Sequence, residues 1–373
     1  MPRFSLIASS LLLAGTGIQP AAAQEPPRVV ASIAPVWALV AGVTEGVTEP
    51  VLLMDPTISP HDYSLRPSEG QALQDADVVF WVGPQIEQVL PDALDALAGD
   101  AHVVRLSLVP GVTALPVREG GAYEPHVHSH HDHGDDMHDE HEHADHDEDE
   151  DDDHHVHEHD DDDHDHDVHE HDDEDDDHDG HEHDDDHDGH EHEHEDDDHH
   201  DGSVDMHMWL DPVNAIVWTD AIATTLAEVD PAHADAYRAN AGAQMADLEA
   251  LSGELDTLLA PVRDRPFLVF HDAYQYFEAR FGLAGVGSIT IHPDLPLSPE
   301  RIYEVRERLV ATGAVCVFAE PQFDQHRVAV VTEDTGAEIG VLDPIGGTVE
   351  GPRTYQGILL TLAHSLVDCL GRE

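Results

Sequence analysis

One stretch of the sequence, residues 124–202, consists almost entirely of histidine, aspartate and glutamate. Residues 124–201 hold 26 of the chain's 34 histidines and 42 of its 81 acidic residues, and they contain no Lys or Arg. Such a composition buries too little apolar surface to offset the entropy lost on ordering. We therefore predict that this stretch, called the tract below, is a disordered insertion between two folded segments.

The side chains of the tract predict metal binding. Imidazole nitrogens alternate with carboxylates, as in the HEHEH run at residues 190–194, and both groups are ligands for divalent cations. An acidic linker that only improves solubility is the alternative. Acidic residues alone would serve that purpose, whereas one residue in three of the tract is histidine.

Charge and length limit the remaining possibilities. The net charge is −66 with neutral histidines; the tract contributes −42, which leaves −24 for the other 294 residues. A nucleic-acid-binding protein needs a basic surface, so that class is excluded, and cations are the expected partners. The 294 residues exceed the usual size of one domain and predict two domains.

The first residues predict export. Arg3 precedes an apolar run over residues 4–18, and Ala21–Ala23 fits a signal-peptidase site, so we expect a signal peptide over residues 1–23. An uncleaved N-terminal anchor is the alternative, but the apolar run is short for a membrane span. No later stretch has 18 continuous apolar residues, which predicts a soluble mature protein. The sequence has two cysteines, Cys316 and Cys369, and in an exported chain these are expected to form one disulfide.

Short β-branched segments alternate with helical ones on both sides of the tract. Expected strands are 28–33, 47–54, 77–82 and 102–106, then 266–270, 314–319 and 337–342. Expected helices are 36–42, 67–73, 86–97 and 213–228, then 231–259, 274–281, 299–311, 325–335 and 355–370. This alternation predicts an α/β fold of two lobes, each a parallel sheet flanked by helices. The helix at 231–259 would be about 40 Å long, enough to cross from one lobe to the other, although a surface helix is an alternative.

Eight histidines lie outside the tract, and three of them are assigned to loop starts after strands, beside turn residues: His61, His207 and His271. Asp343 occupies the same kind of position. Ligands of open α/β sheets gather at the carboxyl ends of the strands, so these side chains are expected to converge in a cleft between the lobes. Three nitrogens and one oxygen suit Zn²⁺ in tetrahedral geometry. Any one of these histidines alone would more often be a structural or surface residue.

Residues 28–112 and 206–373 resemble the metal-binding periplasmic solute-binding proteins of ABC transporters, and among them the zinc-uptake (ZnuA-like) group. The motifs that carry the resemblance are ASIAP at 31–35, PHDY at 60–63, HMWLDP at 207–212, HDAYQYF at 271–277, AEPQ at 319–322 and LDPIG at 342–346. The resemblance implies two lobes, residues 24–230 and 261–373, joined by one long rigid helix over about 231–260. It implies zinc ligands at His61, His207 and His271, an acidic ligand position at Asp343, and the Cys316–Cys369 disulfide.

The resemblance also implies a function. The protein would be a periplasmic monomer, not an enzyme, that captures Zn²⁺ and delivers it to the membrane permease of an ABC transporter, with periplasmic zinc chaperones as further partners. The tract would gather or sense zinc. Some members have a glutamate where this chain has Pro60, so the fourth ligand is either Asp343 or water. Manganese-type relatives have a carboxylate where this chain has His271, which favours zinc over uptake of manganese or iron.

Other residues have weaker signals. Trp209, Glu320 and Asp272 are candidates for orienting the ligands, but packing or capping explains each as well. His292, in the IHPD motif at 291–294, lies in a loop between expected elements and is a candidate for contacting the site, with a surface loop as the alternative. The remaining histidines are assigned surface or structural roles: His102, His233, His326 and His364.

Two other functions are consistent with a metal-binding tract. A zinc hydrolase would need water at the fourth position and a general base; the sequence has no HExxH-like pair and offers only Glu320. A secreted zinc store would use the tract as its functional element and the lobes as a scaffold.

Overall fold

The structure, a computed structural model, describes residues 25–118, 204–290, 293, 296–349, 351 and 353–372. The expected signal peptide, the tract and His292 lie outside these residues, and what the sequence predicts of them stays a prediction. None of the helices in the described ranges combines the length and apolar character that a membrane span needs.

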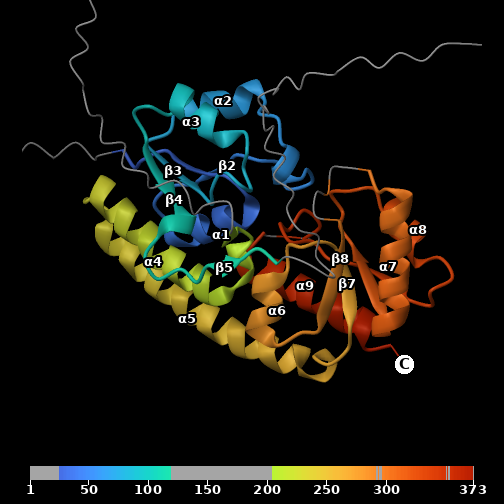
Figure 1. Cartoon of the computed structure of the whole chain (residues 1–373). Helices are drawn as coiled ribbons and strands as arrows, with labels where there is room; N and C mark the ends of the chain where they lie inside the picture. Colours follow the sequence, from blue (N-terminus) through green and yellow to red (C-terminus); the bar gives the residue numbers. More distant parts are fainter. Residues whose placement is uncertain are drawn as a thin grey trace, which may run out of the picture. The chain divides into compact units, whose positions relative to one another are not determined.

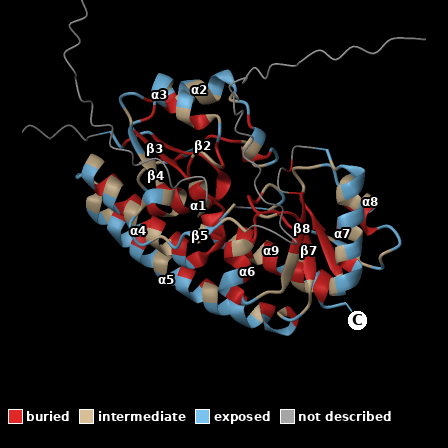
Figure 2. Cartoon of the chain, in the orientation of Figure 1, coloured by how far each residue is buried: buried red, intermediate tan, exposed pale blue. Residues whose placement is uncertain are grey.

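The N-terminal lobe contains a parallel four-stranded sheet with the order β2-β1-β3-β4. Its strands are β1 (Val29–Ala31), β2 (Val51–Leu52), β3 (Val78–Trp81) and β4 (His102–Arg105). Its helices are α1 (Ala34–Val43), α2 (Pro67–Gln74), α3 (Leu90–Leu97) and α4 (Pro212–Val229). The central strands β1 and β3 are buried along their whole length (Figure 2), as expected where helices cover both faces of a parallel sheet.

The C-terminal lobe repeats this architecture with the strand order β10-β9-β7-β8, again all parallel. Its strands are β7 (Phe267–His271), β8 (Gly285–Thr290), β9 (Cys316–Ala319) and β10 (Glu338–Val341). Its helices are α6 (Gln275–Phe281), α7 (Pro299–Thr312), α8 (His326–Thr332) and α9 (Tyr355–Leu370). The two-lobed α/β fold predicted from the sequence is confirmed.

One long helix, α5 (Ala234–Leu259), joins the lobes. It packs against α1 and α4 at one end and against α6 and α9 at the other, and Figure 1 shows it running beside both sheets. The helix begins three residues later than expected. The reason is the Asp230 carboxylate, which accepts one hydrogen bond from the Tyr237 hydroxyl at 3.0 Å and lies 2.6 Å from His233 Nδ1. These contacts hold residues 230–233 in a turn.

Helix α3 begins at Leu90 rather than at residue 86. Pro91 is the second residue of this helix, where a backbone N–H has no partner within the helix, so the N–H that proline lacks is not missed. The preceding residues instead form a loop in which the buried Glu87 carboxylate accepts hydrogen bonds from the backbone N–H groups of Val82 and Gly83, at 3.0 and 2.8 Å. It also accepts one from the Ser32 hydroxyl.

Two short strands on either side of residues 119–203 were not expected from the sequence. β5 (Leu115–Pro116) and β6 (Val204–Asp205) form an antiparallel pair in which Leu115 is opposite Asp205. Each has only two residues and no apolar alternation, so the pattern that reveals the longer strands is missing.

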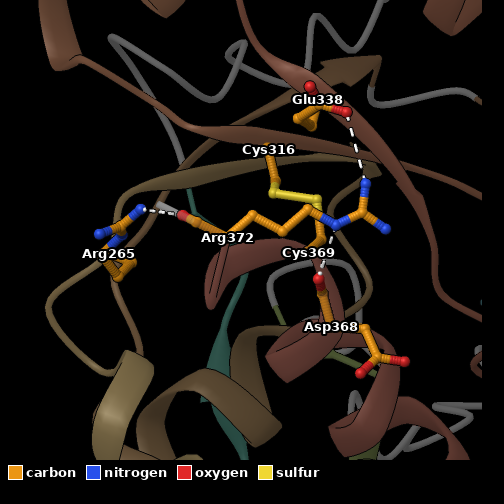
Figure 3. The surroundings of a disulfide bond; sticks show 6 residues. All are labelled: Arg265, Cys316, Glu338, Asp368, Cys369 and Arg372. Atoms are coloured by element: carbon orange, nitrogen blue, oxygen red, sulfur yellow. Dashed lines mark hydrogen bonds and ion pairs between the residues drawn. A yellow bond between two sulfur atoms is a disulfide. The ribbon is translucent and has the colours of Figure 1, made fainter.

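The disulfide predicted between Cys316 and Cys369 is confirmed; it links β9 to the last turn of α9 (Figure 3). Polar contacts surround it. Arg372 donates through Nε to the Asp368 carbonyl oxygen at 3.0 Å and lies 3.5 Å from the Glu338 carboxylate, while Arg265 donates to the Arg372 carbonyl oxygen at 2.9 Å. The C-terminal helix is therefore fastened to the sheet of its own lobe.

Candidate metal centre

His61 lies on the short 3₁₀ helix η1 (Pro60–Asp62), in the loop that follows β2. The Ser59 hydroxyl accepts a hydrogen bond from the His61 backbone N–H at 3.3 Å and caps this turn. The loop is braced by Tyr63, whose hydroxyl donates to Glu69 at 2.8 Å and accepts from the Asp55 N–H at 2.9 Å. These contacts fix the backbone of the loop that carries one of the three imidazoles.

His207 lies between β6 and the 3₁₀ helix η4 (Met208–Leu210) and is buried. One oxygen of the buried Asp205 carboxylate accepts a hydrogen bond from the His207 backbone N–H at 3.0 Å and lies 2.8 Å from its Nδ1. This contact leaves Nε2 of His207 as the nitrogen that is free to bind a metal.

His271 is the last residue of β7 and is also buried. Its Nδ1 lies 2.7 Å from the carboxylate of Glu320, which follows β9 and is 2 % exposed. Glu320 therefore orients His271 in the same way as Asp205 orients His207. The expectation that Glu320 orients a ligand agrees with this contact.

The three imidazoles come together in one place. The candidate ligand atoms of His61, His207 and His271 all lie within 4.8 Å of one another, and no other group of this kind occurs among the described residues. The Nε2 atoms of His207 and His271 are 3.3 Å apart. Two nitrogens bound to one tetrahedral zinc at 2.0–2.1 Å would be separated by about 3.3–3.4 Å. These two rings therefore already have the spacing that a single zinc ion requires.

The cavity at the three rings is small. It offers a volume of about 10 Å³ to the centre of a water-sized sphere, which is room for roughly one water molecule or ion. It is lined by Ser59, Pro60, His61, His207, Trp209, His271, Glu320, Gln322, Phe323, Pro344 and Ile345. The space at the three rings therefore matches the size of a single ion.

Burial and neighbouring charges set the protonation of the site. Burial lowers the pKa of His207 well below its usual value, and the charge of His271 lowers it further, so His207 is neutral and able to bind a metal. Burial also lowers the pKa of His271, but the Glu320 carboxylate outweighs this effect and the pKa is raised overall. Burial raises the pKa of Asp205 to about 7.

Contacts across the cleft hold the two lobes against each other. Trp209 Nε1 donates to the Pro344 carbonyl oxygen at 2.7 Å, and the Tyr355 hydroxyl donates to the Trp209 carbonyl oxygen at 2.6 Å. On the other side of the site, Gln322 Nε2 donates to the Pro56 carbonyl oxygen at 3.2 Å. The rings are therefore held by both lobes together.

Asp343 is near this site but is not part of the three-histidine group. One oxygen of its carboxylate accepts hydrogen bonds from Gln322 Nε2 at 2.9 Å and the Gly346 N–H at 3.0 Å. The other accepts from the backbone N–H and the hydroxyl of Thr348, at 2.6 and 2.7 Å. Both oxygens are thus used to shape the loop that follows β10.

The remaining candidates lie elsewhere. Asp272 forms an ion pair with Arg118 rather than with a histidine, and His233 pairs with Asp230 in the turn before α5. Asp205 was missed in the sequence because it directly follows the acidic tract, where one more aspartate has no distinguishing feature. An acidic residue two positions before a candidate ligand, as in DMH at 205–207, is the signal that would have identified it.

Comparisons with known proteins identify the family of this chain. The family model described as zinc-uptake complex component A, periplasmic, matches residues 29–369. The high-affinity zinc uptake system protein ZnuA of Brucella suis is 42 % identical over 369 residues, covering 99 % of this chain and 98 % of the relative. The protein of the same name from Yersinia pestis is 33 % identical over 98 % of this chain and 96 % of the relative.

Among solved structures, a ZnuA crystal structure superimposes with a TM-score of 0.64 at 19 % identity, over 92 % of this chain and 99 % of that one. This similarity shows a common fold. The family match and the two sequence relatives show more than the fold, because the relatives are 42 % and 33 % identical to this chain over nearly its whole length. The chain belongs to the ZnuA family of periplasmic zinc-uptake components.

Proposed function

We propose that this protein captures Zn²⁺ with His61, His207 and His271 in the cleft between its lobes and delivers it to the permease of an ABC transporter. The observation that carries the proposal is the 3.3 Å spacing of the His207 and His271 Nε2 atoms, with both Nδ1 atoms paired to buried carboxylates. Imidazoles oriented in this way bind metal more tightly than free ones. The family and the names of the relatives supply the transport context.

Zinc is the metal that the site favours. Three imidazole ligands suit Zn²⁺, whereas sites for Mn²⁺ contain more carboxylate oxygens. A fourth ligand completes the tetrahedron. Because both oxygens of Asp343 already accept hydrogen bonds, we propose water at the fourth position, and the prediction that Asp343 itself binds zinc stays open to test.

We also propose that the tract gathers zinc near the cleft. Its 26 histidines offer many weak, exchanging sites, which raise the local zinc concentration around the tight site. Imidazole binds metal only when neutral, so loading of the tract should weaken as the pH falls below about 6.5. A periplasmic location, a monomeric state and exchange with periplasmic zinc chaperones belong to the same proposal.

Calorimetric zinc titration of the mature protein, with and without residues 126–200, tests this function. We expect the deletion variant to keep one tight site that His207→Ala removes. His102→Ala, which alters an exposed histidine on β4, serves as the matched control and should bind zinc as the parent does.

Weak or absent binding by the deletion variant would contradict the proposal and favour a zinc store that works through the tract. Chelator-sensitive turnover of ester or phosphate model substrates would instead favour a hydrolase. Glu320, the general base that the sequence offered, is paired with His271, so we expect no turnover.

A further inference from the structure

A segment of the chain just before the tract connects the two lobes close to the metal centre. Residues 113–118, called the strap below, begin on the N-terminal lobe, where the Thr113 N–H donates to Asn214 Oδ1 at 2.7 Å and Asn214 Nδ2 donates to the Thr113 carbonyl oxygen at 3.1 Å. Asn214 is buried on α4. The strap then pairs with β6 through Leu115 and Pro116 and ends at Arg118.

Arg118 binds two carboxylates of the C-terminal lobe. Its Nε and Nη2 donate to the two oxygens of Asp272, the first at 3.0 Å, and its Nη1 donates to Glu278 at 2.5 Å. The guanidinium thus makes a bidentate pair and a third charged hydrogen bond, which is the geometry that distinguishes arginine from lysine. All three side chains are largely buried, so these contacts are weakly screened by solvent.

Glycine at position 285 leaves space for this cluster of charged side chains. Glu278 lies on α6 beside the start of β8, and a Cβ atom at Gly285 would lie 2.4 Å from its carboxyl carbon. Any side chain larger than hydrogen at that position would displace the carboxylate that binds Arg118. The cluster therefore explains why glycine stands at position 285, in a strand that was not among those expected from the sequence.

The strap contacts residues that lie next to two of the candidate metal ligands, His271 and His207. Asp272 directly follows His271, so Arg118 fixes the backbone beside that ring. The Leu115 N–H donates to the Tyr276 hydroxyl at 2.9 Å, and this hydroxyl donates to the Asp205 carbonyl oxygen at 2.6 Å. Asp205 in turn orients His207. The strap thus contacts Asp272, which adjoins His271, and is linked through Tyr276 to Asp205, which orients His207.

We propose that Arg118 is a positioning residue for the metal centre. By holding Asp272 and Glu278 against the strap, it keeps His271 at the separation from His207 that one metal ion requires. This inference rests on the proposed function, because it concerns the same three-histidine site. Without Arg118, the loop after β7 loses its link to the strap, and the two nitrogens no longer have a fixed spacing.

The test uses the full-length mature protein loaded with one equivalent of Co²⁺ in place of Zn²⁺. Tetrahedral Co²⁺ absorbs visible light much more strongly than the octahedral Co²⁺ expected on the tract, so the spectrum reports the cleft site. We expect Arg118→Met to change this spectrum and to speed metal release to a chelator about tenfold or more. Because Arg118 acts through Asp272, the Arg118→Met, Asp272→Asn double variant should release metal no faster than Arg118→Met alone.

The matched control is Arg280→Met. Arg280 also makes a bidentate pair with an aspartate, donating to the two oxygens of Asp211 at 2.7 and 2.6 Å, but Asp211 caps α4 and does not adjoin a ligand. We expect the wild-type spectrum in this variant. An unchanged spectrum and release rate in Arg118→Met would overturn the inference, and so would equal changes in Arg280→Met, which would indicate only a general loosening of the lobes.

If Arg118→Met does not fold, Arg118→Lys is measured in its place. Lysine keeps the positive charge next to Glu278 but cannot form the bidentate pair with Asp272. Faster release from Arg118→Lys supports the inference, whereas wild-type release overturns it. Absence of the tetrahedral spectrum in the wild-type protein would mean that the proposed function itself fails. That result is distinct from a wild-type site that Arg118 does not influence.

Discussion

Trp209 and Pro344 are 135 residues apart in sequence, yet the indole Nε1 of one donates to the carbonyl oxygen of the other at 2.7 Å. This hydrogen bond crosses the cleft beside the metal centre, and the Trp209 ring lies 5.2 Å from that of His207. A single side chain therefore both links the lobes and packs against a candidate ligand, His207.

Replacing this indole tests the contact. Trp209→Phe removes the donor and leaves a buried carbonyl oxygen unpaired, which costs about 1–3 kcal/mol of folding free energy. We expect weaker zinc binding as well, measured by titration alongside urea unfolding. Trp218→Phe is the control, because the buried Trp218 Nε1 has no hydrogen-bond partner in the described parts of the chain. Equal losses of zinc affinity in both variants would show that the hydrogen bond has no special role.

The carboxylates behind the histidines are expected to strengthen zinc binding. Asp205→Ala and Glu320→Ala each free one Nδ1 and remove a negative charge, so zinc affinity should fall about 10- to 100-fold. Asp220→Ala, at an exposed position on α4, should have no effect. Competition with a chromogenic chelator measures the three affinities, and parental affinity in both test variants would contradict this role.

Asp343→Asn separates the two candidates for the fourth ligand. If water completes the site, this variant should bind zinc within a few-fold of wild type, because asparagine can still accept hydrogen bonds in the loop through one oxygen. If Asp343 is a ligand, the affinity should fall as far as it does in His207→Ala. The same chelator competition distinguishes these results.

Glu87 is expected to make stability depend on pH. Burial raises its pKa from 4.5 to about 7, so the folded protein holds this proton to a higher pH than the unfolded chain does. Its stabilising contribution is complete below pH 4.5 and is lost as the pH rises through about 7.

Comparison with Glu87→Gln isolates this effect, since glutamine has the same shape and does not titrate. Relative to the variant, the wild type should lose on the order of 1–3 kcal/mol between pH 4.5 and 8. Urea unfolding at a series of pH values gives the difference. Glu45→Gln, at an exposed position, should follow the wild-type curve. Parallel curves for wild type and Glu87→Gln would mean that Glu87 ionises normally.

Removing the disulfide should affect stability and not the metal centre. The Cys316→Ser, Cys369→Ser double variant is expected to lose about 2–5 kcal/mol of folding free energy. Zinc affinity should stay within a few-fold of wild type, because the link joins β9 and α9. A reducing agent should lower the stability of the wild type and leave that of the double variant unchanged.

Local signals allowed much of the fold to be predicted. The helices expected over 213–228 and 299–311 are found as α4 and α7. Their starts have local signals, since Asp211 and Ser298 accept capping hydrogen bonds and each precedes a proline in the first turn. The disulfide was predicted because the exported chain has two cysteines. His61 and His271 were chosen because strand ends in an α/β fold share one edge. The same reason was given for His207, but in the structure His207 follows β6, a short antiparallel strand outside both parallel sheets that the sequence did not predict.

What the sequence did not reveal depends on distant contacts. β8 contains Gly285 because Glu278 lies against it, and Arg118 is placed by Asp272, 154 residues further along the chain. Neither relationship has a local pattern. The hydrogen bonds that Asp343 accepts from its own loop and from Gln322 were likewise not apparent from the sequence, and its role as a zinc ligand stays a prediction.

The pairing of β5 with β6 has a consequence for how this protein can change over time. Leu115 and Asp205 are direct neighbours across this pair, so the described residues on the two sides of 119–203 are joined at a single point. Any segment inserted there is a loop whose two ends are held close together. Doubling the length of a flexible loop raises the entropic cost of closing it by only about 0.6 kcal/mol. Histidines and acids can accordingly be gained or lost in large numbers while the cleft is left intact, which makes metal-gathering capacity and metal affinity separately adjustable.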